Sequence, residues 1–388
     1  MNDRSSRDAR APTPRRIGSF LAGAALLLLT ACPTTPKRAA SVTPLQVEPP
    51  AETTNKPVPE VVDSHPQGVT NKAAGSPALA GWEQRIPRTG WIPLQRWAEL
   101  NDLPPPHLTG PGPDVEIEAG PGVLVVKTGL RQALWNGSSI GLGFRPFLTN
   151  NQLQVHVLDA RKNLQPLLEA PLVFNRTNLI VIDPGHGGDN PGTRSIFDNG
   201  LEKDLALDWS RRLARLCEAQ GYKVALTRTN DASRSLYDRI AFANQTNAAL
   251  FISLHFNSFE GKGATAQAGL ETYCVTPRGM PSNLTRGYED DPSRAFPNNA
   301  FDDQNLQLAV RVHQALVRAT GRVDRGVRRA RFMTVLREQP RPAILVEGGY
   351  LSHPEEAKLI SDPNFRQKLA EGVFQALIEE PPAQKNLR

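Results

Sequence analysis

Apolar residues recur along the C-terminal half of the chain with two different periods. Short, mostly apolar runs, which are typical of buried strands, occupy residues 179–182, 222–226, 250–254, 269–275 and 343–346. Between them, apolar residues return every three or four positions, which predicts helices over 202–220, 235–247 and 304–319 and two further helices that begin near 354 and 364. Alternating strands and helices predict an α/β fold with a central, mostly parallel sheet flanked by helices.

The region before this one has the shorter period of β-structure. Apolar and polar residues alternate in short runs such as 153–159, as they do in half-buried strands, and glycines separate the runs. We therefore expect a small β-rich domain over residues 81–170, followed by the α/β domain over residues 171–388. The two histidines of the small domain, His107 and His156, are interpreted as surface or packing residues.

Residues 1–32 have the pattern of a targeting segment. Arg15 and Arg16 supply positive charge, and residues 17–31 form an apolar stretch that is too short for a standard transmembrane helix. The stretch ends in Leu29-Thr30-Ala31-Cys32, which resembles a bacterial lipobox, so we expect cleavage before Cys32 and acylation of its thiol. An ordinary signal peptide with a chance cysteine is the alternative.

Residues 33–80 are rich in proline and polar residues and have no periodic apolar pattern. Such a composition cannot bury a core, and it predicts an extended, disordered tether. Together with Cys32, the tether predicts a lipoprotein of the cell envelope that faces the periplasm. Pro33 follows the lipobox in place of the Asp that marks inner-membrane retention in some bacteria, which favours the outer membrane.

Charge and cysteine content narrow the class of protein. A formal net charge of +6 suits an acidic polymer such as a cell-wall glycan, and it is no nucleic-acid footprint by itself. Three cysteines are too few for a disulfide scaffold. Cys217 falls in a predicted helix and Cys274 in a predicted strand, and both are interpreted as buried thiols. A bridge between these two cysteines is the alternative in an oxidising compartment.

The candidate chemistry lies where predicted strands end. His186, His255 and Glu347 each follow a strand, and open α/β sheets gather such residues at one edge. Glu202 begins a predicted helix, where the helix dipole alone would explain a glutamate. Taken together, the two imidazoles and the Glu202 carboxylate suit a single Zn²⁺ ion, with a fourth position left for water.

Asp183 and Asn257 stand close in sequence to the two histidines. Polar side chains at these positions would orient the imidazoles from behind. Both residues are also good turn formers, and the two interpretations stay open at this point.

Five motifs, in this order, resemble the catalytic domain of zinc-dependent N-acetylmuramoyl-L-alanine amidases of the cell-separation type. They are IDPGHGG (182–188), EKDLAL (202–207), TRTND (227–231), FISLHFNS (251–258) and AILVEGGYLS (343–352). The resemblance spans residues 179–378. The small domain resembles the copper-amine-oxidase N-terminal-like module of bacterial envelope proteins, through residues 133–137, 143–146 and 155–157, which implies an accessory module without copper.

The amidase resemblance implies a role for each site residue. His186, Glu202 and His255 would bind one zinc ion, which lowers the pKa of a bound water and polarises the scissile carbonyl. Glu347 would act as general base and then as general acid toward the leaving amine. The implied substrate is peptidoglycan, cut between the lactyl group of N-acetylmuramic acid and L-alanine during cell-wall remodelling and cell separation.

The residues by themselves indicate only zinc-dependent hydrolysis. One alternative is therefore a zinc peptidase that cuts within peptidoglycan stem peptides. The other is a catalytically inactive wall-binding protein.

Two segments depart from a simple α/β pattern. Residues 277–303 are long, polar and acidic, which predicts either a lid or an autoinhibitory segment that a protein activator displaces. The arginines of residues 325–329 are interpreted as a solvated face, with a surface for acidic wall groups as the alternative.

Overall fold

A computed structural model of the protein describes residues 81–378, except for 111, 171 and 288. The predicted targeting segment with Cys32, the predicted tether over 33–80 and residues 379–388 lie outside the described residues. Within the described part of the chain, no helix is both long enough and apolar enough to cross a membrane.

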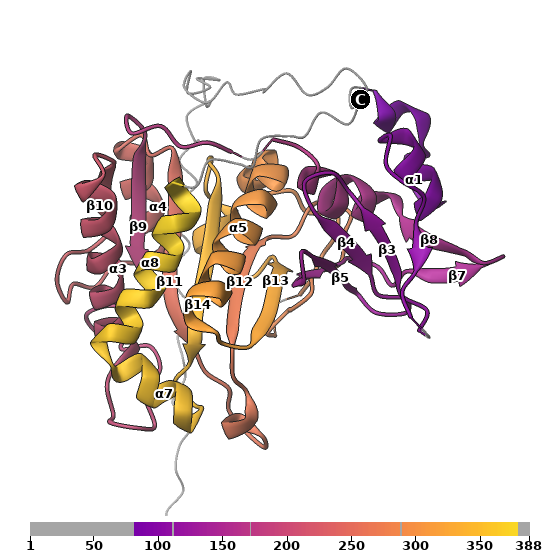
Figure 1. The fold of residues 1–388 in the computed structure, drawn as a ribbon. Coiled ribbons are helices and arrows are strands. Elements are labelled where there is room, and N and C mark those ends of the chain that lie inside the picture. Colours follow the sequence, from indigo (N-terminus) through magenta and orange to yellow (C-terminus); the bar gives the residue numbers. More distant parts are fainter. Residues whose placement is uncertain (1–80, 111, 171, 288, 379–388) are drawn as a thin grey trace, which may run out of the picture. The chain divides into compact units, whose positions relative to one another are not determined.

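One large mixed sheet organises the structure (Figure 1). Its eleven strands are, in spatial order, β10 (Lys223–Leu226), β9 (Leu179–Pro184), β11 (Leu250–Asn257), β14 (Ala343–Tyr350), β12 (Leu270–Val275), β13 (Asp324–Ala330), β6 (Ser138–Gly141), β5 (Gln132–Trp135), β4 (Val123–Val126), β3 (Val115–Glu118) and β2 (His107–Leu108). From β10 to β14 the pairings are parallel; β12 runs antiparallel to β14, and β13 runs parallel to β12. The predicted α/β fold with a mostly parallel sheet is confirmed.

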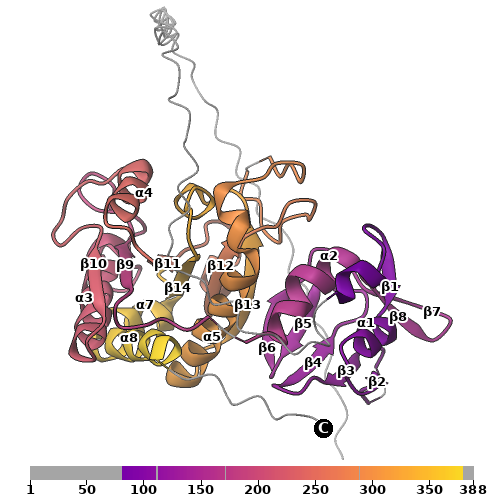
Figure 2. The same ribbon diagram turned by 90° about the horizontal axis from the view of Figure 1, so that it is seen from above.

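Helices cover both faces of the parallel part of this sheet (Figure 2). On one face, apolar residues of α3 (Glu202–Ala219), α5 (Asp302–Thr320) and α8 (Pro363–Ile378) join the larger core cluster, and α7 (Pro354–Ser361) precedes α8. On the other face, α4 (Leu236–Gln245) and α6 (Thr334–Arg337) pack on a smaller cluster around Phe251 and Tyr273. This second face carries the candidate site.

The N-terminal part of the described chain continues the same sheet. Strands β2 to β6 form an antiparallel meander, and β6 pairs in parallel with β13 through Ile140 and Val327. A separate small sheet contains β1 (Trp91–Pro93), β8 (Gln152–His156) and β7 (Phe147–Thr149), next to α1 (Leu94–Leu100) and α2 (Val157–Asp159). The described residues belong to one compact unit, so the boundary near residue 170 stays a prediction.

Two strands near the candidate site extend further than the apolar pattern predicts. Strand β11 continues to Asn257 and β14 to Tyr350, because each strand supplies hydrogen-bonding partners to the other beyond the apolar run. Gly348, directly after Glu347, lets helix α3 pack closely on β14, since a Cβ at this position would lie 2.8 Å from the Trp209 ring. His255 and Glu347 therefore lie within strands, which fixes their backbones.

The arginine-rich segment is the strand β13 rather than a solvated face. Arg329 is only 1% exposed, so the solvated-face interpretation is wrong for this residue. Its guanidinium donates to Asn163 Oδ1 and to the carbonyls of Lys162 and Val275. Cys217 and Cys274 are both buried and free, as the thiol interpretation predicts, and the alternative bridge is not formed.

Candidate metal centre

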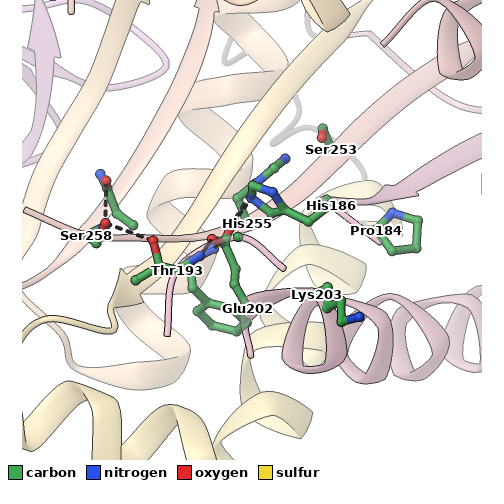
Figure 3. A network of polar contacts seen from close by, with 12 residues as sticks. Pro184, His186, Thr193, Glu202, Lys203, Ser253, His255 and Ser258 are labelled. Carbon is green, nitrogen blue, oxygen red and sulfur yellow. Dashed lines mark hydrogen bonds and ion pairs between the residues drawn. The ribbon is translucent and has the colours of Figure 1, made fainter. Parts of the chain in front are cut away.

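Three side chains from three different elements converge at the carboxyl edge of the parallel strands. Figure 3 shows His186 from the loop after β9, Glu202 from the first turn of α3 and His255 from β11 pointing toward one another. Glu202 Oε1 lies 3.0 Å from His186 Nε2 and 3.0 Å from His255 Nδ1, and the two nitrogens are 3.2 Å apart. The sequence prediction named these three residues, and the structure brings them together.

The loop that carries His186 has an unusual backbone. His186 adopts a φ of 60°, and no Cβ fits at Gly185, where it would lie 2.2 Å from the His255 ring. Two buried arginines hold the loop from behind: Arg228 donates to the carbonyls of Pro184 and Gly185, and Arg239 donates to those of Pro184 and His186. Gly185 therefore makes room for the His255 imidazole, and the two arginines provide hydrogen-bond donors for the carbonyl groups of the loop.

Asn190 orients the His186 ring, a role that sequence reasoning missed. Its Oδ1 accepts from the backbone N–H of Gly192, which identifies this atom as the oxygen, and lies 2.9 Å from His186 Nδ1. Because Oδ1 can only accept, His186 Nδ1 carries a proton, and Nε2 is the nitrogen that can bind a metal once it has lost its own proton. The tight turn after His186 brings Asn190 back over the ring, and its position four residues after His186 is the signal that the sequence offers.

Glu202 is held as a carboxylate. It is 3% exposed, Oε1 also accepts from the Phe256 N–H, and Oε2 accepts from the Thr193 N–H. Burial opposes ionisation, but hydrogen bonds with the two imidazoles outweigh it and lower the pKa of Glu202 to about 2. Thr193 is itself fixed, since its hydroxyl donates to Ser258 Oγ (Figure 3).

The donor set fits a zinc ion. Zinc prefers imidazole nitrogens and carboxylate oxygens at about 2.0–2.2 Å in tetrahedral geometry, which puts neighbouring ligand atoms roughly 3.3–3.6 Å apart. The three donor atoms form a triangle with sides of 3.0, 3.0 and 3.2 Å, so small movements would accommodate the ion. The arrangement also leaves one tetrahedral position without a protein ligand, as in catalytic zinc sites.

Glu347 faces the same cavity, which has a volume of about 300 Å³ and is also lined by the three candidate ligands. The side chain is 6% exposed, and its Oε2 has no hydrogen-bond partner among the described atoms. Burial raises the pKa of Glu347 to about 8; His255 opposes this increase and the Glu202 carboxylate adds to it. A buried carboxyl group without a partner, next to a set of metal-binding side chains, is a candidate general base in its ionised form.

Asp183 lies behind the site and Asn257 lines its cavity, but both bond to other groups. The buried Asp183 carboxylate accepts from Thr227, Arg239 and Ser253, and reaches His186 only through Arg239. Asn257 donates to Glu271 and accepts from Arg286. Within the described chain, Asn190 makes the contact at His186 Nδ1, and the orienting role of Asp183 and Asn257 stays a prediction.

The segment 277–303 contributes a cation to the cavity. Among its described residues, Arg286 is the one that lines the cavity, and its Nη2 donates to Asn257 Oδ1 at 2.9 Å. The acidic side chains point to other partners: Asp290 pairs with Arg331, and Asp302 accepts from Asn299. In this conformation, no described carboxylate of the segment lines the metal centre.

Comparisons with known proteins show which family the chain resembles. A family model described as N-acetylmuramoyl-L-alanine amidase matches residues 180–379. Three similar proteins are N-acetylmuramoyl-L-alanine amidase AmiC of Neisseria meningitidis serogroup B (30% identity; 51% of this chain, 51% of the relative), AmiC of Escherichia coli O6:H1 (31%; 52% and 52%) and the sporulation-specific N-acetylmuramoyl-L-alanine amidase of Bacillus subtilis (34%; 50% and 64%). The chain spans about half the length of the two AmiC relatives.

Proposed function

We propose, because the chain belongs to the N-acetylmuramoyl-L-alanine amidase family over residues 180–379, that this protein is a zinc-dependent peptidoglycan amidase. It would cut the amide between the lactyl group of N-acetylmuramic acid and L-alanine, and so act in cell-wall remodelling and cell separation. One observation supports the proposal most directly: Glu347, buried and unpartnered at Oε2, shares a cavity with His186, Glu202 and His255.

The residues present divide the work of hydrolysis. His186, Glu202 and His255 would hold one Zn²⁺ ion, which supplies Lewis-acid polarisation of the scissile carbonyl and lowers the pKa of a water. Asn190 keeps His186 in the tautomer whose Nε2 can bind a metal. Glu347 Oε2 accepts the proton of the attacking water and passes it to the nitrogen of L-alanine as the amide bond breaks.

Burial explains how one carboxyl group can serve in both steps. A group whose pKa lies near neutral pH gains and loses a proton at little cost. Burial raises the pKa of Glu347 to about 8, which brings it into this range. Arg286 places a positive charge at the same cavity and is suited to bind a carboxylate of the substrate.

We also propose that the protein acts at the cell envelope, as a lipoprotein that faces the periplasm. The support is the sequence at residues 29–32 and the proline-rich composition of residues 33–80. Incorporation of labelled palmitate into the wild type and its loss in Cys32→Ser would test this; palmitate incorporation that persisted in the variant would refute it.

The activity is tested with the full chain, zinc-loaded, on purified peptidoglycan, with the released fragments identified by mass spectrometry. The proposal predicts stem peptides that begin with an intact L-alanine, and their loss on chelation and in Glu347→Gln. Glu355→Gln, an exposed glutamate on α7, is the matched control. Cuts inside the peptide would instead establish a peptidase. Binding without any release, also after addition of envelope extract as a source of activator, would favour a wall-binding protein.

A further inference from the structure

A second cavity lies where the catalytic sheet meets the N-terminal meander, on the same face as the metal centre. Its volume is about 240 Å³, and its lining includes Arg131, Gln132, Asn283, Arg325 and Arg328. The cavity lies beside the pairing of β13 with β6. Its residues therefore come from three parts of the chain that are distant in sequence.

The lining of this cavity is positively charged. Three of the lining side chains are arginines, and no acidic side chain is among them. Arg325 and Arg328 share one carboxylate, that of Glu271, at 2.9 and 3.3 Å. The Arg131 guanidinium donates to the carbonyls of Leu142, Pro281 and Ser282, which are neutral acceptors. The described contacts thus leave more positive than negative charge at the cavity. Burial also disfavours the charged form of Arg131 and lowers its pKa.

The walls of the cavity are fixed before any ligand arrives. Asn283 donates to the Leu142 carbonyl and accepts from the Arg329 N–H. A Cβ at Gly141 would lie 2.2 Å from Asn283 Oδ1, so the glycine is what lets the loop approach the strand. Gln132 donates to Ser139 Oγ across β5 and β6. A preformed cationic cavity of this kind loses little freedom when an anion binds.

A short ridge joins this cavity to the metal centre. Residues 281–286 supply Asn283 to one cavity and Arg286 to the other. A chain of hydrogen bonds runs beneath the ridge, from Arg286 to Asn257, from Asn257 to Glu271 and from Arg325 to Glu271. The two cavities are therefore neighbours on one surface, connected by shared partners.

We infer that this second cavity is a binding site for carboxylate groups of an acidic peptide. The inference rests on the proposed function, under which that peptide is the stem peptide of peptidoglycan. Arginine is the residue best suited to carboxylate recognition, because its planar guanidinium offers paired donors. Arg325 is held through Nε by Glu271, and Arg131 by backbone carbonyls, so both guanidinium groups are oriented in advance.

The test measures binding rather than turnover. The full chain carrying Glu347→Gln is titrated by calorimetry with L-alanyl-γ-D-glutamyl-meso-diaminopimelate, and separately with the same peptide carrying amidated carboxyl groups. Losing one charge-assisted pair is expected to weaken binding about tenfold in Arg328→Gln. Gln132→Glu, which keeps the shape of the side chain and adds a negative charge, should weaken it to a similar extent. Arg215→Gln, an exposed arginine on α3, is the matched control and should bind like the parent.

Each outcome decides a separate point. Weaker binding in both cavity variants but not in the control, with little binding of the amidated peptide, supports the site. Unchanged binding in both cavity variants overturns it. If inorganic phosphate binds in a way that depends on Arg328 and the acidic peptide does not, the carboxylate assignment is overturned. If the peptide binds as expected but the wild type releases no stem peptide from peptidoglycan, the site stands and the proposed function fails.

Discussion

Glu347 on β14 lies directly beside His255 on β11 in the parallel register of the two strands. Side chains at paired positions of neighbouring strands point to the same face of a sheet. The register therefore delivers a candidate ligand and a candidate base to one cavity, and any shift between the two strands would separate them. This relationship leads to the first prediction.

Glu347→Gln is expected to reduce stem-peptide release by about 10²–10⁴-fold, the range found for general acid–base groups. Glutamine keeps the shape of the side chain but cannot accept the proton. The zinc content of the purified protein, measured by mass spectrometry, should remain that of the wild type, because Glu347 is not one of the converging donors. Loss of zinc together with activity would contradict the assigned role.

Asn190→Ala is expected to lower zinc affinity about 10–100-fold, as changes behind a metal ligand commonly do. Without the Oδ1 acceptor, the proton on His186 Nδ1 is no longer fixed and Nε2 is less available to the metal. Competition with a chromogenic chelator measures the affinity. Asn230→Ala, an exposed position on a nearby loop, should leave it unchanged; equal affinities in the two variants would count against the orienting role.

Arg286→Gln is expected to raise the KM for peptidoglycan fragments several-fold while kcat changes little. A surface charge that binds substrate and transition state equally affects binding alone. Arg278→Gln, an exposed arginine of the same segment, is the control. A large fall in kcat at constant KM would show that Arg286 acts on the reacting atoms instead.

Asp159 makes stability depend on pH. Burial raises its pKa from 3.8 to about 6, against hydrogen bonds from Gly143, Asn163 and Phe144. The folded state therefore holds the proton more tightly than the unfolded state, so the free energy of unfolding falls as pH rises from about 4 to about 6. The contribution is on the order of 3 kcal/mol.

The Asp159 effect is isolated by comparing urea unfolding of the wild type and Asp159→Asn at several pH values. The free energy of unfolding of the wild type, relative to that of Asp159→Asn, should fall as pH rises through this window, because only the wild type loses stability to ionisation of this group. Asp102→Asn, an exposed aspartate in a turn, is the control. A difference that stays constant with pH would exclude the ionisation of Asp159 as its source.

The sequence predicted most of the helices and strands, and it named the three side chains that the structure brings together, because both depend on local pattern. Apolar runs marked the strands before His186 and His255, and helical spacing marked α3, whose first residue is Glu202. Local pattern does not reveal how a loop folds back, and so Asn190 was missed. Strand β13 was missed because its buried Arg329 is satisfied by partners such as Lys162 and Asn163, far away in sequence.

Arg286 is a second residue whose position the local sequence pattern does not reveal. It stands in a long polar segment without periodicity, and its contacts with Asn257 and the Phe332 ring place it at the cavity. The sequence interpretation assigned the arginines of residues 325–329 to a solvated face, with a surface for acidic wall groups as the alternative. The distribution of partners decides which arginines are structural, such as Arg329, and which line a cavity, such as Arg325 and Arg328.

The pairing of β6 with β13 has a consequence for the edges of the large sheet. Without β6, strand β13 would be an edge with unpaired backbone N–H and C=O groups, which is a template for pairing with another copy. The opposite edge, β10, is only four residues long. The N-terminal meander thus acts as an edge protector, and a fragment trimmed to the family-matched region would carry an open sheet edge prone to aggregation.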